Sequence, residues 1–459
     1  MTLVVVGGGL TGLTAAWEWR RSHPDDEIVV LEADRRLGGK LDRVELAGQW
    51  YDTGPEAMLA RVPEAVELVR ELGLGGELVQ PQTTQASVVL PEGRFPLPAG
   101  TVLGVPTGPA GLDGVLTPAG VARVAAEADL PPLRVDGDVA VGRLLRERLG
   151  DEVVDRLVEP LLGGVYAGRA DELSLQATMP GLAAQLGRSP SVLAAATAAR
   201  DAGARSRGDA DGPVFVTVAS GIGSLPAALV AATGARVRLG ARVERLTRSA
   251  AGFSVRLASG EELAADAVVL ATPAGATARL LRDVAPDAVA PLTGIPYASM
   301  AVVAMAFPAQ EVAAGSGLLV PPVTGRLVKG VTVSSAKWPH LGAGGVLRVR
   351  SSVGRSGDDA DLGRDDAELT AAVVADVADL LQLERPEPLD THLVRWVDGL
   401  PQYLVGHVDR VAAARAAVAA VPGLAIAGAA YEGVGVPACI RDARRAVAAL
   451  AGDRATMGA

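Results

Sequence analysis

Three glycines near the start of the chain have the spacing of a dinucleotide-binding turn. Gly7, Gly9 and Gly12 follow an apolar, strand-like run and open a helical stretch. Glycines in this pattern allow a tight turn and a close approach of the backbone to a pyrophosphate, while the helix start offers N–H donors. Glu32 follows the second predicted strand, Glu27–Leu31, where a carboxylate can accept hydrogen bonds from a ribose. The pattern predicts a nucleotide site in a βαβ unit; the alternative is a glycine turn that binds nothing.

The residues after Glu32 resemble those of the flavoproteins of the amine-oxidase superfamily. Gly38-Gly39-Lys40 stands where these proteins carry a glycine pair that passes near the cofactor, and Asp52-Thr53-Gly54-Pro55 comes next. A Gly-x-Gly-x-x-Gly turn alone does not separate NAD from FAD, so the choice of FAD rests on this resemblance. Lys40 taken alone is equally compatible with a solvated surface cation.

The resemblance also implies that distant parts of the chain complete the flavin site. It places a middle strand around Arg242-Val243-Glu244 and a glycine-rich turn followed by a helix at Gly428–Pro437. N–H groups at a helix start can bind a flavin carbonyl and stabilise the negative charge that gathers there on reduction; a plain helix cap and packing turn is the alternative. The residues predicted to bind FAD are Gly7, Gly8, Gly9, Leu10, Thr11, Gly12, Glu32, Ala33, Gly39, Lys40, Gly54, Pro55, Val243, Trp396, Gly428, Gly435 and Val436.

Four separated motifs resemble a narrower family, the flavin-dependent porphyrinogen oxidases of haem biosynthesis. They are Gly150–Gly168, Leu173–Leu175, Lys337–His340 and Leu400–His407, in the order that the family has them and over essentially the whole chain. The resemblance is closest to the bacterial branch, which oxidises coproporphyrinogen III. The mitochondrial and plant branch carries an arginine near the start of one strand, where this chain has Ala86.

This resemblance implies an enzyme that oxidises coproporphyrinogen III to coproporphyrin III with FAD and oxygen and releases hydrogen peroxide. Six electrons and six hydrogens leave the substrate, which implies three rounds of hydride transfer from a meso carbon to flavin N5. Protoporphyrinogen IX is the alternative substrate. Two other functions stay open: a superfamily enzyme acting on a polyamine or a polyene, and a flavin or porphyrin carrier without catalysis. We assign no catalytic residue, because the cofactor performs the chemistry.

Gly164 and Tyr166, in the helical motif, are predicted to line the substrate pocket; a bent helix and glycine turn is the structural alternative. Coproporphyrinogen bears four carboxylates, so its pocket needs local positive charge. We expect Lys337 to provide it, and Arg94 is a weaker candidate. Each of the two is equally compatible with a solvated surface charge. For His340 and His407, a structural role is the favoured interpretation.

The composition excludes several other functions. With 459 residues, 49% hydrophobic and 21% charged, the chain is expected to fold into two or three domains. A net charge of −10 and a pI of about 5.1 argue against nucleic-acid binding. Cys439 has no second cysteine to pair with, which fits a reducing cytoplasm. The four histidines lack the spacing of metal ligands, so we predict no metal site.

We expect no membrane-spanning segment. The apolar runs Leu3–Trp17, Phe95–Leu112 and Ala288–Gln310 are each interrupted by glycine or proline. In related enzymes the helical region contacts the membrane, so peripheral attachment stays open, as does a transient contact with a downstream ferrochelatase. The expected partners are a porphyrinogen and oxygen, the expected location is the cytoplasm, and the protein is expected to be a monomer or a homodimer.

The order of these features predicts an α/β fold with a discontinuous Rossmann-like FAD-binding domain, a mixed α/β substrate domain and an inserted all-helical domain. The FAD-binding domain is expected to comprise residues 1–82, 214–275 and 388–459. The substrate domain is expected to comprise 83–112 and 276–387, and the helical insert 113–213.

Local signals predict some element boundaries. Thr117-Pro118 and Ser189-Pro190 each place a capping residue before a proline, which predicts two helix starts. Asp365–Leu381 is predicted to be a strong helix. The polar, glycine-rich Arg200–Pro213 is predicted to be a mobile linker.

Overall fold

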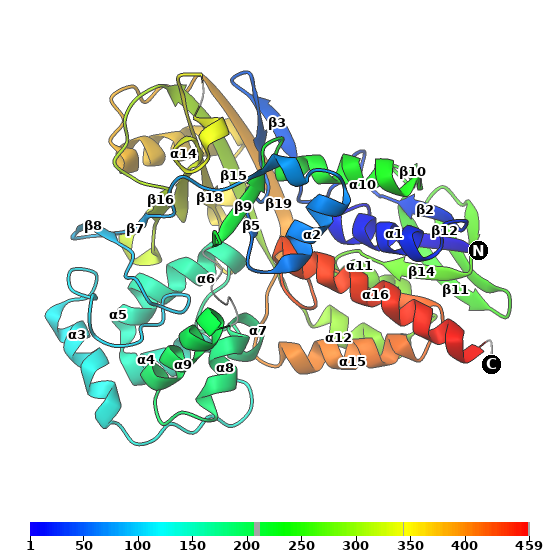
Figure 1. Ribbon diagram of the computed structural model, residues 1–459, viewed down its shortest axis with the longest axis horizontal. Coiled ribbons are helices and arrows are strands. Elements are labelled where there is room, and N and C mark those ends of the chain that lie inside the picture. Colours follow the sequence, from blue (N-terminus) through cyan, green and yellow to red (C-terminus); the bar gives the residue numbers. More distant parts are fainter. Residues whose placement is uncertain (206–211, 343, 458–459) are drawn as a thin grey trace.

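The computed structural model describes residues 1–205, 212–342 and 344–457. Figure 1 shows three parts: a sheet that carries helices from both ends of the chain, a larger sheet, and a group of helices beside them. The N-terminus and the C-terminal helix lie in the same part, which the glycine turns of the sequence also occupy.

The first sheet is parallel throughout and takes strands from both ends of the chain. Its order is β10-β2-β1-β14-β20, and each neighbouring pair is parallel. Alternate residues of β1 pack into different cores, Leu3 and Val5 on one face and Val4 and Val6 on the other. Burial on both faces explains the continuous apolar run. The strands are β1 (Thr2–Val6), β2 (Glu27–Leu31), β10 (Arg236–Arg238), β14 (Ala267–Leu270) and β20 (Leu424–Ile426).

A layer of structure covers each face of this sheet. The layer that packs against Leu3 and Val5 consists of α1 (Leu10–Ser22), α2 (Pro63–Glu71), α10 (Leu225–Thr233) and α16 (Val436–Met457). The opposite layer consists of a three-stranded antiparallel sheet and three helices. Its members are β11 (Val243–Ser249), β12 (Gly252–Leu257), β13 (Glu262–Ala265), α11 (Ala274–Leu281), α12 (Val289–Thr293) and α15 (His407–Ala419). The predicted Rossmann-like α/β arrangement is therefore confirmed.

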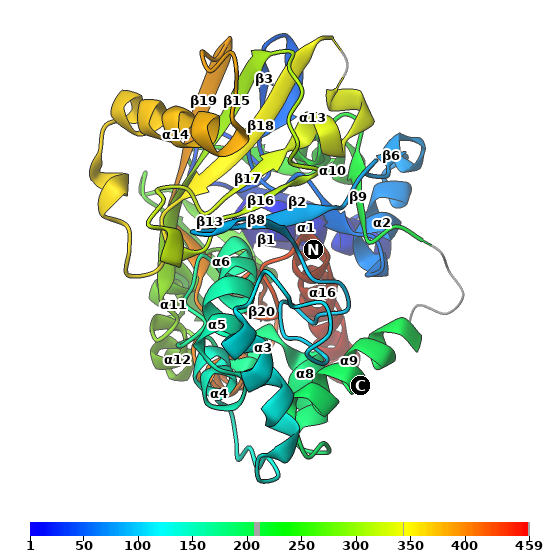
Figure 2. The same cartoon turned by 90° about the vertical axis from the view of Figure 1, so that its left-hand side faces the viewer.

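The larger sheet has seven strands in the order β19-β15-β18-β17-β16-β7-β8 (Figure 2). The helix α14 (Asp366–Leu381) packs on one of its faces, and the Asp365 side chain caps it by accepting a hydrogen bond from the Glu368 N–H at 2.8 Å. The strands are β7 (Ala86–Leu90), β8 (Gly93–Pro96), β15 (Tyr297–Pro308), β16 (Gly317–Leu319), β17 (Gly330–Val333), β18 (Val346–Val353) and β19 (Asp390–Pro401).

Two of the expected domain boundaries fall elsewhere in the structure. β19 pairs with β15 in the seven-stranded sheet, although residues 388–459 were assigned to the FAD-binding part. In the other direction, α11 and α12 pack into the core of the parallel sheet, although residues 276–387 were assigned to the substrate part. Strand pairing and core packing decide to which part of the fold each of these elements belongs. Neither can be deduced from the order of the elements in the sequence. The complete division into domains stays a prediction.

Helices occupy the stretch from Pro118 to Arg205. They are α3 (Pro118–Ala125), α4 (Val141–Leu149), α5 (Asp151–Val153), a π-helical turn at Val154–Val158, α6 (Glu159–Tyr166), α7 (Leu175–Thr178), α8 (Pro180–Leu186) and α9 (Val192–Arg205). Their core also includes Val88 and Leu90 of β7. Because the helices share this core with the large sheet, their independence as a domain stays a prediction.

Two of the local signals need correction. Thr117 caps α3 as expected, since its side chain accepts from the Gly120 N–H at 3.1 Å. The second helix starts later than expected, because Ser191 rather than Ser189 accepts the capping bond, from the Ala194 N–H at 3.1 Å. The helix α9 continues to Arg205, so the beginning of the predicted linker Arg200–Pro213 is helical. Residues 206–211 of that linker lie outside the described residues.

Short elements connect the parts. β3 (Arg43–Leu46) and β4 (Gln49–Asp52) form a hairpin, and β9 (Phe215–Val218) pairs with both β5 (Met58–Leu59) and β6 (Leu78–Val79). The single turn α13 (Ser334–Lys337) follows β17. Within the described part of the chain, no helix combines the length and apolar character needed to cross a bilayer.

Candidate functional site

The glycine turn between β1 and α1 leaves space in front of a helix start. Gly7 has a φ of +108°, and a Cβ on Gly12 would lie 2.0 Å from the Gly7 carbonyl oxygen. Both positions therefore require glycine. Gly9 is the N-cap of α1, and a Cβ there would meet no atom within 4 Å. This open space before the free N–H groups of Leu10, Thr11 and their neighbours suits the phosphates of a nucleotide.

Glu32 fixes this turn from the end of β2. Its Oε2 accepts a hydrogen bond from the Gly8 N–H at 2.7 Å and its Oε1 one from the Asp34 N–H at 2.8 Å. Ala33, between them, is exposed. The Glu32 carbonyl accepts from the Ala241 N–H at 2.8 Å, which brings the start of β11 and Val243 toward this end of the sheet. A carboxylate oxygen has more than one lone pair, so Glu32 can accept from a ribose while it holds Gly8.

The second and third predicted turns lie against the first. The Gly38 N–H donates to the Gly8 carbonyl at 2.8 Å, and Gly39 approaches so closely that its Cβ would lie 3.4 Å from the Gly9 Cα. A Cβ on Gly54 would lie 1.9 Å from the Lys40 carbonyl oxygen, which leaves room only for glycine beside Pro55. The structure therefore brings these three turns together, as predicted.

Lys40 is a half-buried cation rather than a solvated one. Burial lowers the pKa of its ammonium group, and the nearby Cys439 acts in the opposite direction. Among the residues that the structure describes, none accepts a hydrogen bond from Lys40. An ammonium group that has left water without an ion-pair partner favours an anionic ligand beside it. This contradicts the surface interpretation of Lys40 and suits a phosphate or a reduced flavin.

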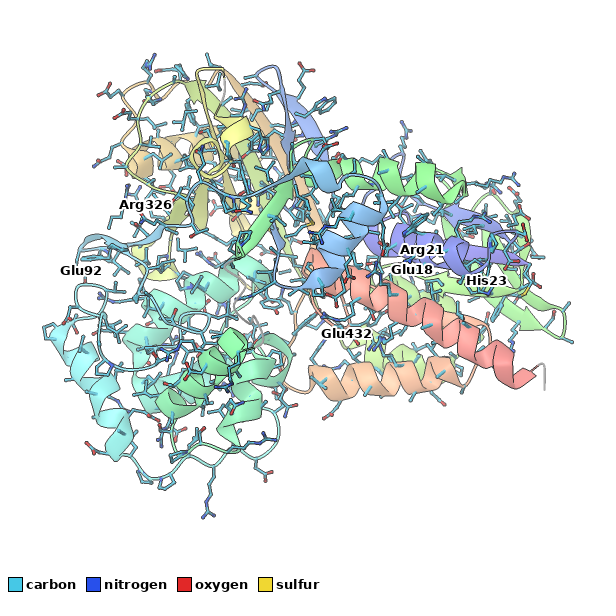
Figure 3. The ribbon with its side chains drawn as sticks, in the orientation of Figure 1. Glu18, Arg21, His23, Glu92, Arg326 and Glu432 are labelled. Atoms are coloured by element: carbon cyan, nitrogen blue, oxygen red, sulfur yellow. The ribbon has the colours of Figure 1, made fainter. Side chains whose placement is uncertain are left out.

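The C-terminal turn follows β20 and leads into α16, and a buried carboxylate fixes it. Asp442, which is fully buried, accepts from the Gly428 N–H at 2.9 Å and from Arg415 at 2.5 Å. Burial raises the pKa of Asp442 to about 6, although Arg415 and the Gly428 N–H favour its charged form. Glu432, labelled in Figure 3 on the same turn, accepts from Arg415 at 2.8 Å. The turn is thus held rigid before a cofactor arrives.

The starts of α1 and α16 lie next to each other. Leu10 and Val436 share one core, Gly435 accepts the hydrogen bond of the Cys439 N–H at 3.0 Å, and Thr11 lies within hydrogen-bonding reach of the Cys439 thiol. Burial raises the pKa of that thiol to about 11, so it stays neutral. Two helix starts side by side place two sets of N–H donors at one site.

The helix α6 reaches this site through Tyr166. The Tyr166 ring lies 5.4 Å from the ring of Tyr403, whose hydroxyl donates to the carbonyl of Ala429 in the C-terminal turn. The Tyr166 carbonyl accepts from the Gln402 side chain at 2.7 Å. Gly164 is exposed, and a Cβ there would meet no atom within 4 Å. Tyr166 thus lies beside the C-terminal turn, through Tyr403, and Gly164 is exposed on the same helix.

Lys337 does not provide free positive charge. Its Nζ donates to Glu56 at 2.9 Å, and the same carboxylate accepts from Ser334 and Trp338 at 2.8 and 3.1 Å. Burial alone would raise the pKa of Glu56, but Arg350 and Lys337 lower it to about 2. The motif Lys337–His340 therefore anchors the segment that follows Gly54-Pro55, and Lys337 is not available to a substrate carboxylate.

Three further predicted residues lie on elements outside the glycine turns. Arg94 donates to the carbonyls of Ala313 and Leu380, so it too is engaged. Trp396 lies on β19 opposite Met300 and packs in the cluster that contains Ala167, the residue after α6. Val243 begins β11 and packs against the core on the face of the parallel sheet that carries Val4 and Val6.

The histidines of the two motifs have structural surroundings. His407 is 1% exposed and stacks on Tyr403 with ring centroids 4.0 Å apart. Burial lowers the pKa of His407 to about 4 and also lowers the pKa of the half-buried His340. Both rings are therefore neutral at pH 7, in agreement with the structural interpretation.

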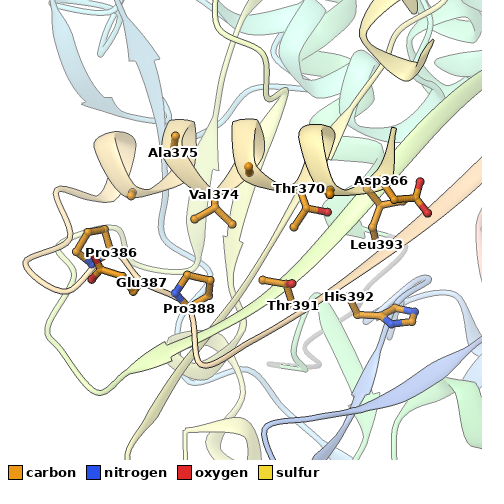
Figure 4. Close-up of a pocket in the computed structure, with 13 residues that line it drawn as sticks. Asp366, Thr370, Val374, Ala375, Pro386, Glu387, Pro388, Thr391, His392 and Leu393 are labelled. Carbon is orange, nitrogen blue, oxygen red and sulfur yellow. The ribbon is translucent and has the colours of Figure 1, made fainter. Parts of the chain in front are cut away.

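A groove of about 800 Å³ lies elsewhere, between α14 and β19 (Figure 4). Its lining includes Val374, Pro388 and Leu393 and contains none of the residues predicted for the site. The groove is therefore separate from the glycine turns.

Sequence reasoning missed Glu56 and Asp442. Glu56 directly follows the Asp52–Pro55 motif, so the sequence could have predicted that it lies beside the site. The sequence could not predict that its carboxylate is buried and charged. Asp442 lies inside α16 with no sequence pattern that marks it.

A parallel sheet whose glycine turns and C-terminal turn converge on two adjacent helix starts is the arrangement of a dinucleotide-binding protein. Residues 10–451 match the family of flavin-containing amine oxidoreductases, and the chain belongs to that family. Its cofactor is FAD, and the unpaired Lys40 and the open space at Gly9 fit an anionic dinucleotide.

Similar proteins cover nearly the whole chain. The coproporphyrinogen III oxidase of Mycobacterium tuberculosis (H37Rv) is 38% identical over 97% of this chain and 96% of that one. The protein of the same name from Bacillus subtilis is 33% identical over 97% of each chain. The crystal structure of a putative protoporphyrinogen oxidase from Exiguobacterium sp. 255-15 is 33% identical, with a TM-score of 0.85 over 98% of both chains.

Proposed function

We propose that the chain catalyses the FAD-dependent oxidation of coproporphyrinogen III to coproporphyrin III in haem biosynthesis. Three molecules of oxygen accept the six electrons and six hydrogens and leave as three molecules of hydrogen peroxide. The observation that carries the proposal is the 38% identity over 97% of the chain to a relative named for this reaction. The placement of α6, a motif of that resemblance, against the C-terminal turn supports it.

The residues of the chain would bind and orient the substrate. FAD, when bound, supplies the acceptor for two electrons at a time. Tyr166 and the open surface at Gly164 would form a wall against which the macrocycle lies, and its orientation would bring a meso carbon toward the glycine turns. Burial raises the pKa of Tyr166 to about 12, so this hydroxyl can donate a hydrogen bond but does not act as a base at neutral pH.

Protoporphyrinogen IX is the second candidate substrate, and one observation favours it. The similar structure from Exiguobacterium is named a putative protoporphyrinogen oxidase. The two substrates differ in carboxylate number, four against two, so the positive charge near the pocket decides between them.

Anaerobic mixing tests the proposal directly. The purified flavoprotein is mixed without oxygen with each reduced tetrapyrrole and with putrescine, and the flavin absorbance is followed. We expect coproporphyrinogen III to bleach the flavin fastest. Admission of air should then restore the flavin colour and yield porphyrin fluorescence and three peroxides per porphyrin. A protein that binds the tetrapyrrole without bleaching is a carrier, and bleaching by putrescine alone indicates an amine substrate.

The location and partners form part of the same proposal. We propose that the protein acts in the cytoplasm as a monomer or homodimer. Contact with a membrane surface or with a ferrochelatase that receives the porphyrin would bring it to the next step. Pull-down with a ferrochelatase and vesicle flotation test these contacts.

A further inference from the structure

Two buried cations without ion-pair partners lie where the large sheet meets α6. Lys329, just before β17, is 5% exposed, and Arg355, just after β18, is 8% exposed. Among the described residues neither forms an ion pair. The Lys329 ammonium has no hydrogen-bond partner there but is not completely enclosed by the protein. Charged groups that leave water without a counter-charge are costly. This cost points to a missing anion.

The backbone holds the two cations on either side of Val320. The Val320 N–H donates to the Lys329 carbonyl at 2.9 Å, and the Val320 carbonyl accepts from the Arg355 side chain at 2.9 Å. The Lys329 N–H also donates to Ser352 at 2.8 Å, and the Arg355 N–H to Asp358 at 2.9 Å. Both positions are therefore fixed by the sheet rather than by loops alone.

No carboxylate among the described residues forms an ion pair with either cation. Glu159 and Asp358 act on Arg355 electrostatically, but neither forms an ion pair with it. Glu159 instead accepts from the Ala170 N–H at 2.7 Å, and burial raises its pKa. Burial and the charge of Arg355 lower the pKa of Lys329 to about 7. A bound anion would reverse this effect and hold both groups charged.

The loop that follows Arg355 lies beside the C-terminal end of α6, next to Tyr166. The loop after Arg355 contacts α6, since the Ser356 N–H donates to Ala167 at 2.7 Å. Propionate groups project from the rim of a tetrapyrrole, so a carboxylate site belongs at a distance from the reacting carbon.

We propose that Lys329 and Arg355 bind a propionate carboxylate of the substrate. The inference rests on the proposed porphyrinogen substrate. The free N–H groups of the Arg355 guanidinium would donate to one carboxylate oxygen or both, and the Lys329 ammonium would add a point charge. Of the candidates from the sequence, Lys337 is paired with Glu56 and Arg94 donates to two backbone carbonyls. Arg355 donates one N–H to the Val320 carbonyl and keeps its other N–H groups available, and no described residue accepts from the Lys329 ammonium.

Binding of a tetracarboxylate and of its ester separates charge recognition from shape recognition. Coproporphyrin III and its tetramethyl ester, in the same detergent, are titrated into the FAD-loaded wild type, Lys329→Met and Arg355→Met, and fluorescence reports the dissociation constants. We expect each variant to bind the acid roughly ten- to one hundred-fold more weakly, because it loses a charge-assisted hydrogen bond. Binding of the ester should be unchanged. Arg248→Met, which removes one charge from the three-stranded sheet, is the control and should bind both as the wild type does.

The outcomes separate this inference from the proposed function. Unchanged acid binding in both folded variants overturns the carboxylate site, even if the wild type oxidises coproporphyrinogen. Selective loss of acid binding upholds the site even in a protein that fails to oxidise any porphyrinogen. Equal loss for acid and ester means that the residues only support the fold, which also overturns it. Thermal denaturation with bound FAD verifies folding, and Arg355→Lys should restore part of the affinity for the acid.

Discussion

Gly12 is a residue at which one added carbon should decide cofactor binding. A Cβ there would lie 2.0 Å from the Gly7 carbonyl oxygen, so Gly12→Ala must displace the turn in front of α1. We predict that the variant purifies with little or no flavin absorbance. The matched control is Gly181→Ala in α8, where a Cβ meets no atom within 4 Å. That variant should retain flavin as the wild type does, and a Gly12→Ala protein with full flavin content would contradict the site.

Glu56 should make stability depend on pH in the acid range. Because its pKa in the folded protein, about 2, lies below the ordinary value of 4.5, its stabilising contribution is complete above about pH 4.5 and is lost as the pH falls toward 2. We predict that Glu56→Gln lowers the free energy of unfolding by about 3 kcal/mol at pH 7, because two half-buried cations, Lys337 and Arg350, lose the buried carboxylate that pairs with them.

Urea unfolding across this pH range provides the measurement. The difference between wild type and Glu56→Gln should shrink on acidification below pH 4.5. Glu261→Gln, which removes an exposed partner of Arg238, is the control and should change little. A constant difference at every pH would show that Glu56 acts through packing instead of charge.

At the scale of single residues, the sequence predicts backbone sites better than charged ones. The positions of Gly7, Gly12 and Gly54 follow from local spacing, because a tight turn depends on neighbouring residues. The partner of Lys337 does not, since Glu56 lies 281 residues away. Whether a cation is free or paired is decided by such distant contacts.

At the scale of elements, the turn between β20 and α16 depends on one side chain of the helix that follows. Asp442→Ala should free the Gly428 N–H and remove one of the two carboxylates that pair with Arg415. We predict about tenfold weaker FAD binding from this loss of a charge-assisted hydrogen bond. Equilibrium dialysis of the apoprotein with FAD measures it.

Glu432→Gln is the matched control for that variant. Glu432 accepts from the same Arg415 but has no bond to Gly428, so its loss should leave FAD affinity nearly unchanged. Equal weakening in both variants would assign the effect to the arginine and not to the turn.

Elements with strong local patterns were predicted well, and those defined by pairing were not. β1, β2 and α14 follow from apolar runs and a cap. Most of the apolar run Ala288–Gln310 forms α12 and β15, which its composition alone does not predict. β19 was assigned to the wrong part because its partner β15 lies about ninety residues earlier, and strand pairing leaves no mark in a single sequence.

At the scale of the whole molecule, the parallel sheet closes only when the end of the chain is present. A chain that ends at Gly423 lacks β20 and α16 and exposes the core residues that pack against them. We predict that it is insoluble or flavin-free, as measured by soluble yield and absorbance. A chain that ends at Ala451 keeps Val447 and Leu450 in that core and should bind flavin. Flavin in the shorter chain would show that the N-terminal turns suffice.

The position of the C-terminal turn has a consequence for biosynthesis. The glycine turn after β1 is translated long before Gly428–Val436 and the α16 helix. A nascent chain therefore has no finished pocket for its coenzyme until Gly428–Val436 and α16 have been synthesised and folded. In a cell short of riboflavin, the species that accumulates would be a full-length apoprotein that awaits its prosthetic group.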